Sequence, residues 1–133
     1  MYHVLLAVDD DERRSTRLAN AVAELPDADE NVFVSVFHCF VDNPAGVSAP
    51  QVGGIRRVID ALEEAGVDHE VLEASGDPAE SILRAADDED VDVIYVAGRS
   101  RSPAGKALFG SVAQSVILGA DRPVTIVGRA GGE

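Results

Sequence analysis

The sequence of 133 residues has little of several features that mark particular classes of protein. It contains one cysteine, Cys39, so no disulfide can form within the chain, and we expect a reducing compartment. No apolar run approaches the roughly 18 to 20 continuous residues that a membrane-spanning helix needs. The first residues carry no basic leader followed by a cleavage site. Together these absences predict a cytoplasmic protein with no membrane partner.

Positive charge is scarce as well. Acidic residues outnumber basic residues by 24 to 11, the formal net charge is −13, and Lys106 is the single lysine. Such a surface repels nucleic acid, which is therefore not expected as a partner. The charge fits either an acidic surface for a protein partner or adaptation to high salt. Because the acids are spread along the chain, adaptation is favoured, and we predict a halophilic source and lower stability in dilute buffer.

What the sequence does contain is an alternation of strand and helix patterns. Apolar and β-branched runs predict strands at residues 3–8, 31–38, 67–74, 91–98 and 122–129. Apolar residues at helical spacing between these runs predict four helices, with core positions Leu18, Val22 and Leu25; Ile55, Val58, Ile59 and Leu62; Ala79, Ile82, Leu83 and Ala86; and Val112, Val116 and Ile117. Asp77 is a predicted N-cap before Pro78, and Gly66 is a predicted helix end.

The order of these elements predicts the fold class. Strands that alternate with helices form a parallel sheet with right-handed crossovers. We expect an α/β protein, Rossmann-like or flavodoxin-like, whose open five-stranded parallel sheet has the order 3-2-1-4-5. One domain is predicted over residues 1–129, with a flexible tail at 130–133. Ligands of such sheets bind at the topological switch point, here at the carboxyl ends of strands 1 and 4.

Three acidic residues follow the first strand at this switch point. Asp9, Asp10 and Asp11 could bind Mg²⁺ or accept hydrogen bonds from ribose hydroxyls, and Asp9 lies closest to the strand end. Asp10 and Asp11 can also be solvated turn residues. The triplet is similar to the acidic pocket of a response-regulator receiver domain. However, strand 3 ends without an aspartate and no lysine follows strand 5, which argues against a receiver.

The second segment at the switch point is the loop after strand 4. Gly98 and Gly110 allow close approach of backbone, and Ser111 adds a hydroxyl to the free N–H groups of a helix start, where anions bind. The loop also carries the cations Arg99, Arg101 and Lys106. It does not have the spacing of a Walker A motif. Alternatively, Ser111 only caps its helix and the glycines only turn the chain.

Five stretches in this order resemble the universal stress protein family of the UspA type. They are LLAVDDDERRS, GDPAESIL, VIYVAGRS, FGSVAQSVI and RPVTIV, and the likeness covers about residues 2 to 128. ATP-binding members carry G-x2-G-x9-G-S/T after strand 4. This chain matches at Gly98, Gly110 and Ser111, but Arg101 replaces the second glycine and the next spacer is one residue shorter. The resemblance therefore implies an adenine nucleotide, ATP or AMP, with Mg²⁺ as a possible companion.

The same resemblance implies positions for the nucleotide. Asp9 would face the ribose or the adenine, and Cys39 and Phe40, just past strand 2, would border the base. An alternative for His38 and Cys39 is a packed strand end. The complete predicted nucleotide site is Asp9, Cys39, Phe40, Gly98, Arg99, Arg101, Gly110 and Ser111. No metal site is predicted, because His3 and His69 have no ligand spacing around them.

Three functions stay open. The leading one is a stress-response protein that binds an adenine nucleotide and acts through conformation or partner binding. A second is slow ATP hydrolysis or self-phosphorylation, and a third is a nucleotide-free interaction domain. A homodimer is expected because the apolar last strand is a candidate bare edge, and because UspA-like proteins commonly pair there. The expected contact residues are Val124, Thr125, Ile126 and Val127.

Overall fold

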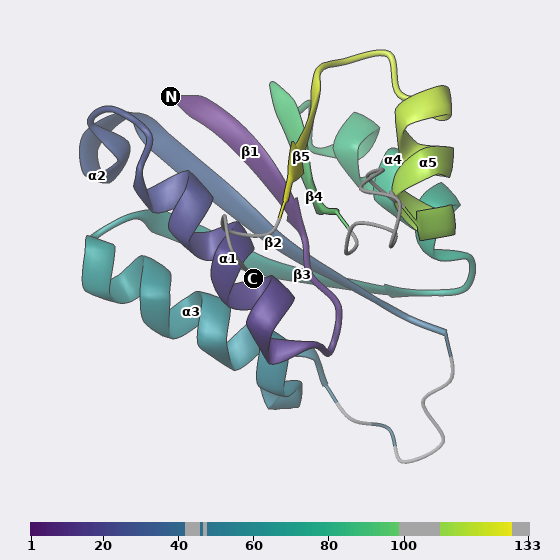
Figure 1. Ribbon diagram of the computed structural model, residues 1–133, viewed down its shortest axis with the longest axis horizontal. Coiled ribbons are helices and arrows are strands. Elements are labelled where there is room, and N and C mark those ends of the chain that lie inside the picture. Colours follow the sequence, from purple (N-terminus) through teal and green to yellow (C-terminus); the bar gives the residue numbers. More distant parts are fainter. Residues whose placement is uncertain (42–45, 47, 99–109, 129–133) are drawn as a thin grey trace, which may run out of the picture.

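The computed structural model describes residues 1–41, 46, 48–98 and 110–128. The strands are β1 (Tyr2–Ala7), β2 (Val32–Phe40), β3 (Asp68–Ser75), β4 (Val93–Ala97) and β5 (Val124–Val127). The helices are α1 (Glu12–Ala23), α2 (Ala28–Asn31), α3 (Gly53–Ala65), α4 (Pro78–Asp88) and α5 (Gly110–Gly119), and a 3₁₀ turn spans Ala49–Gln51. Strand and helix alternate along the chain as the sequence predicts (Figure 1).

All five strands form one parallel sheet in the order β3-β2-β1-β4-β5, which confirms the predicted fold class and strand order. β1 lies at the centre. Its residue Leu5 is paired with Ser35 of β2 on one side and with Ile94 of β4 on the other. The strand order reverses between β1 and β4, so the carboxyl ends of these two strands form the switch point.

A layer of helices covers each face of the sheet, as Figure 1 shows: α1 and α3 lie on one side, α4 and α5 on the other. Successive side chains of a strand point to opposite faces. Val4 and Leu6 therefore enter the core under α1 and α3, whereas Leu5 enters the core under α4 and α5, and all three are fully buried. Burial on both faces explains why β1 is a continuous apolar run.

Local signals place several helix ends where the sequence predicts them. Asp77 is the N-cap of α4 and accepts a hydrogen bond from the Glu80 backbone N–H at 2.9 Å, with Pro78 at the first helical position. Gly66 ends α3 with a φ of 74°, a left-handed conformation that suits glycine. These interactions involve neighbours along the chain, which is why sequence alone finds them.

The structure departs from the prediction in two of its helices. A short additional helix, α2, precedes β2. In α5, the buried residues are Ala113 and Val116, whereas Val112 and Ile117 are 37% and 40% exposed rather than turned into the core. The helix is apolar on nearly all sides, so the spacing of its apolar residues could not show which side faces the sheet.

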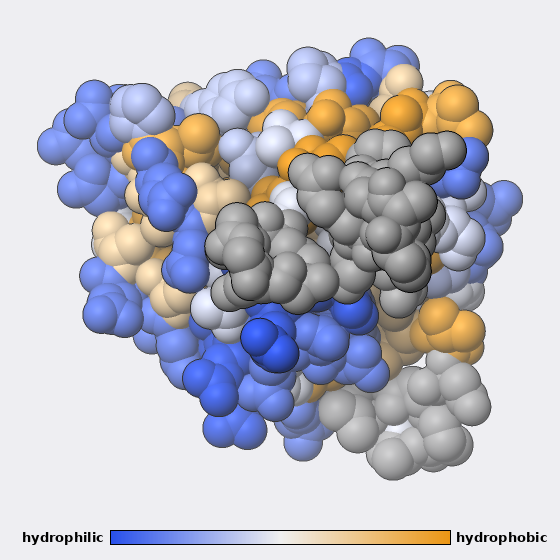
Figure 2. All heavy atoms as spheres, in the orientation of Figure 1, coloured by the Kyte–Doolittle hydropathy of each residue, from blue (hydrophilic) through white to orange (hydrophobic). Residues whose placement is uncertain are grey.

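The two edges of the sheet differ in composition. β3 carries several charged residues, while β5 is apolar and half-buried. Figure 2 shows hydrophobic residues over the region of β5 and α5, and hydrophilic residues over α3. Among the described residues, no helix has both the length and the apolar character that crossing a membrane requires.

Candidate functional site

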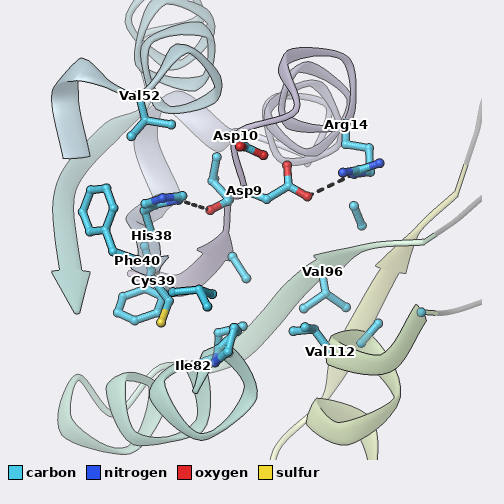
Figure 3. A pocket seen from close by; sticks show the side chains of 18 residues that line it. Asp9, Asp10, Arg14, His38, Cys39, Phe40, Val52, Ile82, Val96 and Val112 are labelled. Carbon is cyan, nitrogen blue, oxygen red and sulfur yellow. Dashed lines mark hydrogen bonds and ion pairs between the residues drawn. The ribbon is translucent and has the colours of Figure 1, made fainter. Parts of the chain in front are cut away.

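A cavity of about 680 Å³ opens at the carboxyl ends of the central strands. This volume lies within the range of roughly 300 to 1,000 Å³ that small-molecule sites occupy. Its wall is formed by the ends of β1, β2 and β4 and by the first turns of α4 and α5 (Figure 3). The cavity therefore lies at the switch point where the sequence predicts a ligand.

Asp9 lies on the rim of this cavity and is held in place by two interactions. Its Oδ2 forms an ion pair with Arg14 Nε at 3.0 Å, drawn in Figure 3, and its Oδ1 accepts a hydrogen bond from the Asp11 backbone N–H at 2.9 Å. Its side chain is nevertheless 48% exposed. A carboxylate has about four acceptor positions, so Asp9 keeps the capacity to accept a hydrogen bond from a ligand.

Arg14 is a site residue that sequence reasoning missed. It lies in the first turn of α1, five residues after Asp9, and lines the same cavity. The signal that could have identified it is Asp11, which caps α1 by accepting from the Arg14 backbone N–H at 2.8 Å. An N-cap at Asp11 turns the first helical residues back toward the end of β1, and so brings the Arg14 guanidinium to Asp9.

Asp11 thus has a structural role, and it is not a pocket residue. The Arg14 backbone N–H lowers the pKa of the Asp11 carboxyl; burial opposes this effect, and the positive charges of Arg14 and Arg17 add to it. Asp10 is exposed and lines the cavity. The three acids therefore divide into two that face the cavity and one that caps a helix.

Cys39 and Phe40 line the cavity, but they are the last residues of β2 rather than the residues just past it. The strand runs two residues further than predicted because β3 continues to pair with it as far as Phe40 and Ser75. The Cys39 thiol donates a long hydrogen bond to the Gly76 backbone oxygen at 3.5 Å. Phe40 is buried and gives the cavity an aromatic wall.

His38 holds the ends of two strands together. It is buried, and its Nδ1 donates a hydrogen bond to the Val8 backbone oxygen at 2.8 Å, the second dashed contact in Figure 3. Its ring meets the Phe40 ring edge-on, with centroids 4.6 Å apart. This arrangement supports a packed strand end for His38. With Nδ1 bonded to the backbone, His38 is tied to β1 rather than paired with the Cys39 thiol.

Of the two described glycines that flank the loop after β4, one reaches the cavity. Gly110 lines it and begins α5 with a φ of 76°. Ser111 is exposed and outside the lining. Gly98 is buried against β5 instead, where an added Cβ would lie 3.1 Å from Ile126 Cγ2.

The predicted residues Arg99 and Arg101 lie outside the described part of the chain, as do Lys106 and the predicted tail 130–133.

Close packing of α3 against the turn after β1 shapes one side of the site. An added Cβ at Gly54 would overlap the Asp9 backbone oxygen and would lie 2.6 Å from Ser15 Oγ. Ser15 is fully buried, and its hydroxyl donates to the Asp11 backbone oxygen at 2.7 Å. Only glycine at position 54 allows this approach, which fixes the position of the turn that carries Asp9.

Comparisons with known proteins identify the family of the chain. A family model described as the universal stress protein family matches residues 1–128. The chain belongs to the universal stress protein family. A universal stress protein of Mycolicibacterium smegmatis is 37% identical over 76 residues, which make up 56% of this chain and 58% of that relative. The sequence match thus spans less than two thirds of the curated relative.

Solved structures of universal stress proteins superpose on the chain along nearly its whole length. A universal stress protein from Archaeoglobus fulgidus has a TM-score of 0.76 and 28% identity, over 96% of this chain and 98% of that one. A family member from Arabidopsis thaliana, determined with AMP bound, has a TM-score of 0.72 and 17% identity, over 100% of this chain and 95% of that one. At that identity, the likeness concerns the fold.

Proposed function

We propose that this universal stress protein binds an adenine nucleotide, ATP or AMP, in the cavity at the switch point and acts through conformation or partner binding. The observation that carries the proposal is that three distant parts of the sequence line one cavity of suitable volume, at Asp9, at Cys39 and Phe40, and at Gly110. The solved relative that contains AMP supports the same ligand class.

The chemistry of the lining fits the parts of such a ligand. Phe40, Cys39 and Ile82 form an apolar wall on which a planar base can lie. The Asp9 carboxylate, oriented by Arg14, accepts hydrogen bonds, so it suits a ribose hydroxyl or the adenine amino group.

The remaining groups of the lining suit the phosphates. The first turn of α5 begins at Gly110, on the cavity wall, and a helix N-terminus attracts phosphate. Asp10, exposed on the rim, is the carboxylate that would take part in holding a Mg²⁺ ion brought by ATP. Arg99 and Arg101 stay predicted phosphate contacts, whereas Gly98 and Ser111 do not line the cavity as described.

Calorimetric titration of AMP and of ATP tests the proposal with a matched pair of variants. Asp9→Asn should weaken binding roughly ten- to hundredfold, because a hydrogen bond to a charged group contributes about 1.5–3 kcal/mol. Asp60→Asn makes the same chemical change on the exposed side of α3 and should bind as the unaltered protein does. If both variants bind AMP and ATP with equal affinity, Asp9 does not contact the nucleotide.

The titration also separates the alternative functions. If the unaltered protein binds neither nucleotide, the nucleotide-free interaction domain is the better account. If ATP binds and is consumed in the presence of Mg²⁺, the protein is a slow ATPase or modifies itself. Binding of either nucleotide without turnover supports the proposed function.

We also infer that two copies pair through β5, using Val124, Thr125, Ile126 and Val127. β5 is the outer strand of the sheet and pairs only with β4 within the chain as described. Its residues are half-buried and uncharged. Beside it, α5 exposes Ile117 and Leu118, the latter to 79%. An apolar open edge of this kind is one that proteins seldom leave without a partner.

A further inference from the structure

A second group of polar side chains lies at the opposite end of the same strands. His3 comes from β1, Glu70 from β3 and Glu89 from the residue that follows α4, and one potential ligand atom of each lies within 4.8 Å of those of the other two. All three residues are half-buried. From His3 to Asp9 the chain advances about 20 Å along β1, at roughly 3.3 Å per residue, so this cluster is separate from the nucleotide cavity.

A buried serine joins two members of the cluster. Ser35 of β2 is fully buried, and its Oγ lies 2.7 Å from His3 Nε2 and donates to Glu70 Oε2 at 2.8 Å. The sheet register produces this arrangement, because Ser35 is paired with Glu70 on one side and with Leu5, two residues from His3, on the other. The serine thus fixes the positions of an imidazole and a carboxylate on two different strands.

Further contacts hold His3 from the other side. Its backbone N–H donates to Asp92 Oδ2 at 2.8 Å, and its backbone oxygen accepts from the Asp92 N–H at 2.8 Å. Its ring lies against Phe33, with centroids 5.0 Å apart. The imidazole is therefore positioned by the fold before any ligand arrives, which lowers the entropy that binding would cost.

The two glutamates concentrate negative charge at one point, because a carboxylate oxygen of each lies within 4.8 Å of that of the other and of a ring nitrogen of His3. Glu89 also lies at the C-terminus of α4, the negative end of the helix dipole. Arg122 is the nearby cation on this end of α4, but it is bound to the Ala86 and Val91 backbone oxygens and to Asp87.

We propose that His3, Glu70 and Glu89 bind a divalent transition metal ion of the zinc type, and that Ser35 is a positioning residue for this site. One imidazole nitrogen and two carboxylate oxygens are ligands that Zn²⁺ accepts, whereas Mg²⁺ and Ca²⁺ prefer oxygen alone. Three protein ligands leave a position open for water or a fourth group. The ion would link β1, β3 and the end of α4.

Zinc binding by the whole protein, freed of metal with a chelator, tests this proposal. Equilibrium dialysis in high salt with excess Mg²⁺ suppresses weak binding to the acidic surface. We expect one Zn²⁺ per chain. Glu70→Gln, Glu89→Gln and His3→Gln should each weaken binding more than tenfold, and Ser35→Ala about ten- to hundredfold, as other residues that orient metal ligands do. Asp68→Asn, an exposed carboxylate on β3 near Glu70, is the control and should bind as the unaltered protein does.

Thermal unfolding is a second measurement, which applies even if the variant of the buried Ser35 folds poorly. Glu89 is half-buried and follows the helix, so Glu89→Gln should retain its far-ultraviolet circular dichroism. Zn²⁺ should raise the thermal midpoint of the unaltered protein and of Asp68→Asn, but not of Glu89→Gln, because an ion that binds only the folded state stabilises it. The proposal is wrong if Glu89→Gln and Asp68→Asn bind Zn²⁺ equally, or if Mg²⁺ displaces all the Zn²⁺.

Discussion

The two ends of the parallel strands hold their charged side chains in opposite ways. At the carboxyl ends, the Asp9 carboxylate is paired with the Arg14 guanidinium and stands beside an apolar wall. At the amino ends, two carboxyls and an imidazole crowd together around a buried serine. The first arrangement pairs a carboxylate with a guanidinium and leaves a cavity for an organic ligand. The second concentrates negative charge and suits a cation.

The largest expected effect comes from the packing that shapes the carboxyl end. Gly54→Ala should destabilise the protein by roughly 3 kcal/mol, since the added methyl group meets the backbone of Asp9 and overpacked sites cost about 1–3 kcal/mol or more. Gly53→Ala is the matched control in the same helix, where the methyl group meets only the flexible Glu12 side chain. Denaturant unfolding measures both. Equal stabilities would mean that α3 does not pack against this turn.

The same variant sharpens the comparison between the two ends. Because Gly54 contacts the turn that carries Asp9, any Gly54→Ala protein that remains folded should lose nucleotide affinity. Its zinc affinity should change little, because the amino-end cluster draws on β1, β2, β3 and α4 instead of α3. Parallel titrations of nucleotide and Zn²⁺ would show whether the two ends are independent. Equal losses at both ends would contradict that separation.

A pair of proline variants of β5 distinguishes folding from pairing between copies. The backbone oxygens of Pro123 and Val127 accept from β4, so alternate residues, Thr125 included, face β4, whereas Ile126 faces the open edge. Thr125→Pro should destabilise the fold by about 2 kcal/mol, because it leaves a buried acceptor unpaired. Ile126→Pro should yield a monomer at a smaller cost in stability.

Light scattering at high salt, combined with thermal unfolding, measures both β5 variants. A monomeric unaltered protein would contradict the inferred dimer, and a dimeric Ile126→Pro protein would show that the copies pair elsewhere.

A smaller effect is expected at His38, which joins β1 to β2. His38→Phe keeps an aromatic ring but leaves the Val8 backbone oxygen without its donor, which should cost roughly 1.5 kcal/mol in the free energy of unfolding. His69→Phe is the control, because His69 Nδ1 bonds to the Val67 backbone oxygen of the same chain segment, two residues away. Urea unfolding compares the two. Similar losses would indicate that the His38 contact contributes little.

Sequence predicted the fold well because the fold depends on signals that are local. Continuous apolar runs marked the strands, and Asp77 and Gly66 marked helix ends through contacts with close neighbours. The prediction that Val112 and Ile117 of α5 face the core was wrong, because a helix that is apolar on nearly all sides gives no preferred face.

The sites were less predictable, because they depend on distances across the sheet. Asp9, Cys39, Phe40 and Gly110 reach one cavity, as expected from the switch point, but Arg14 became visible only once Asp11 was placed as a cap. His3 showed no ligand spacing along the chain. Its neighbours Glu70 and Glu89 reach it through strand register and the end of α4, which a single sequence does not specify.

The central claim is that the carboxyl-end cavity holds an adenine nucleotide. The most direct measurement is to denature the purified protein, separate the small molecules it releases, and identify them by mass. We predict that AMP or ATP is released in amounts comparable to the protein. A protein that releases no nucleotide, and that binds neither AMP nor ATP when titrated, would contradict the account.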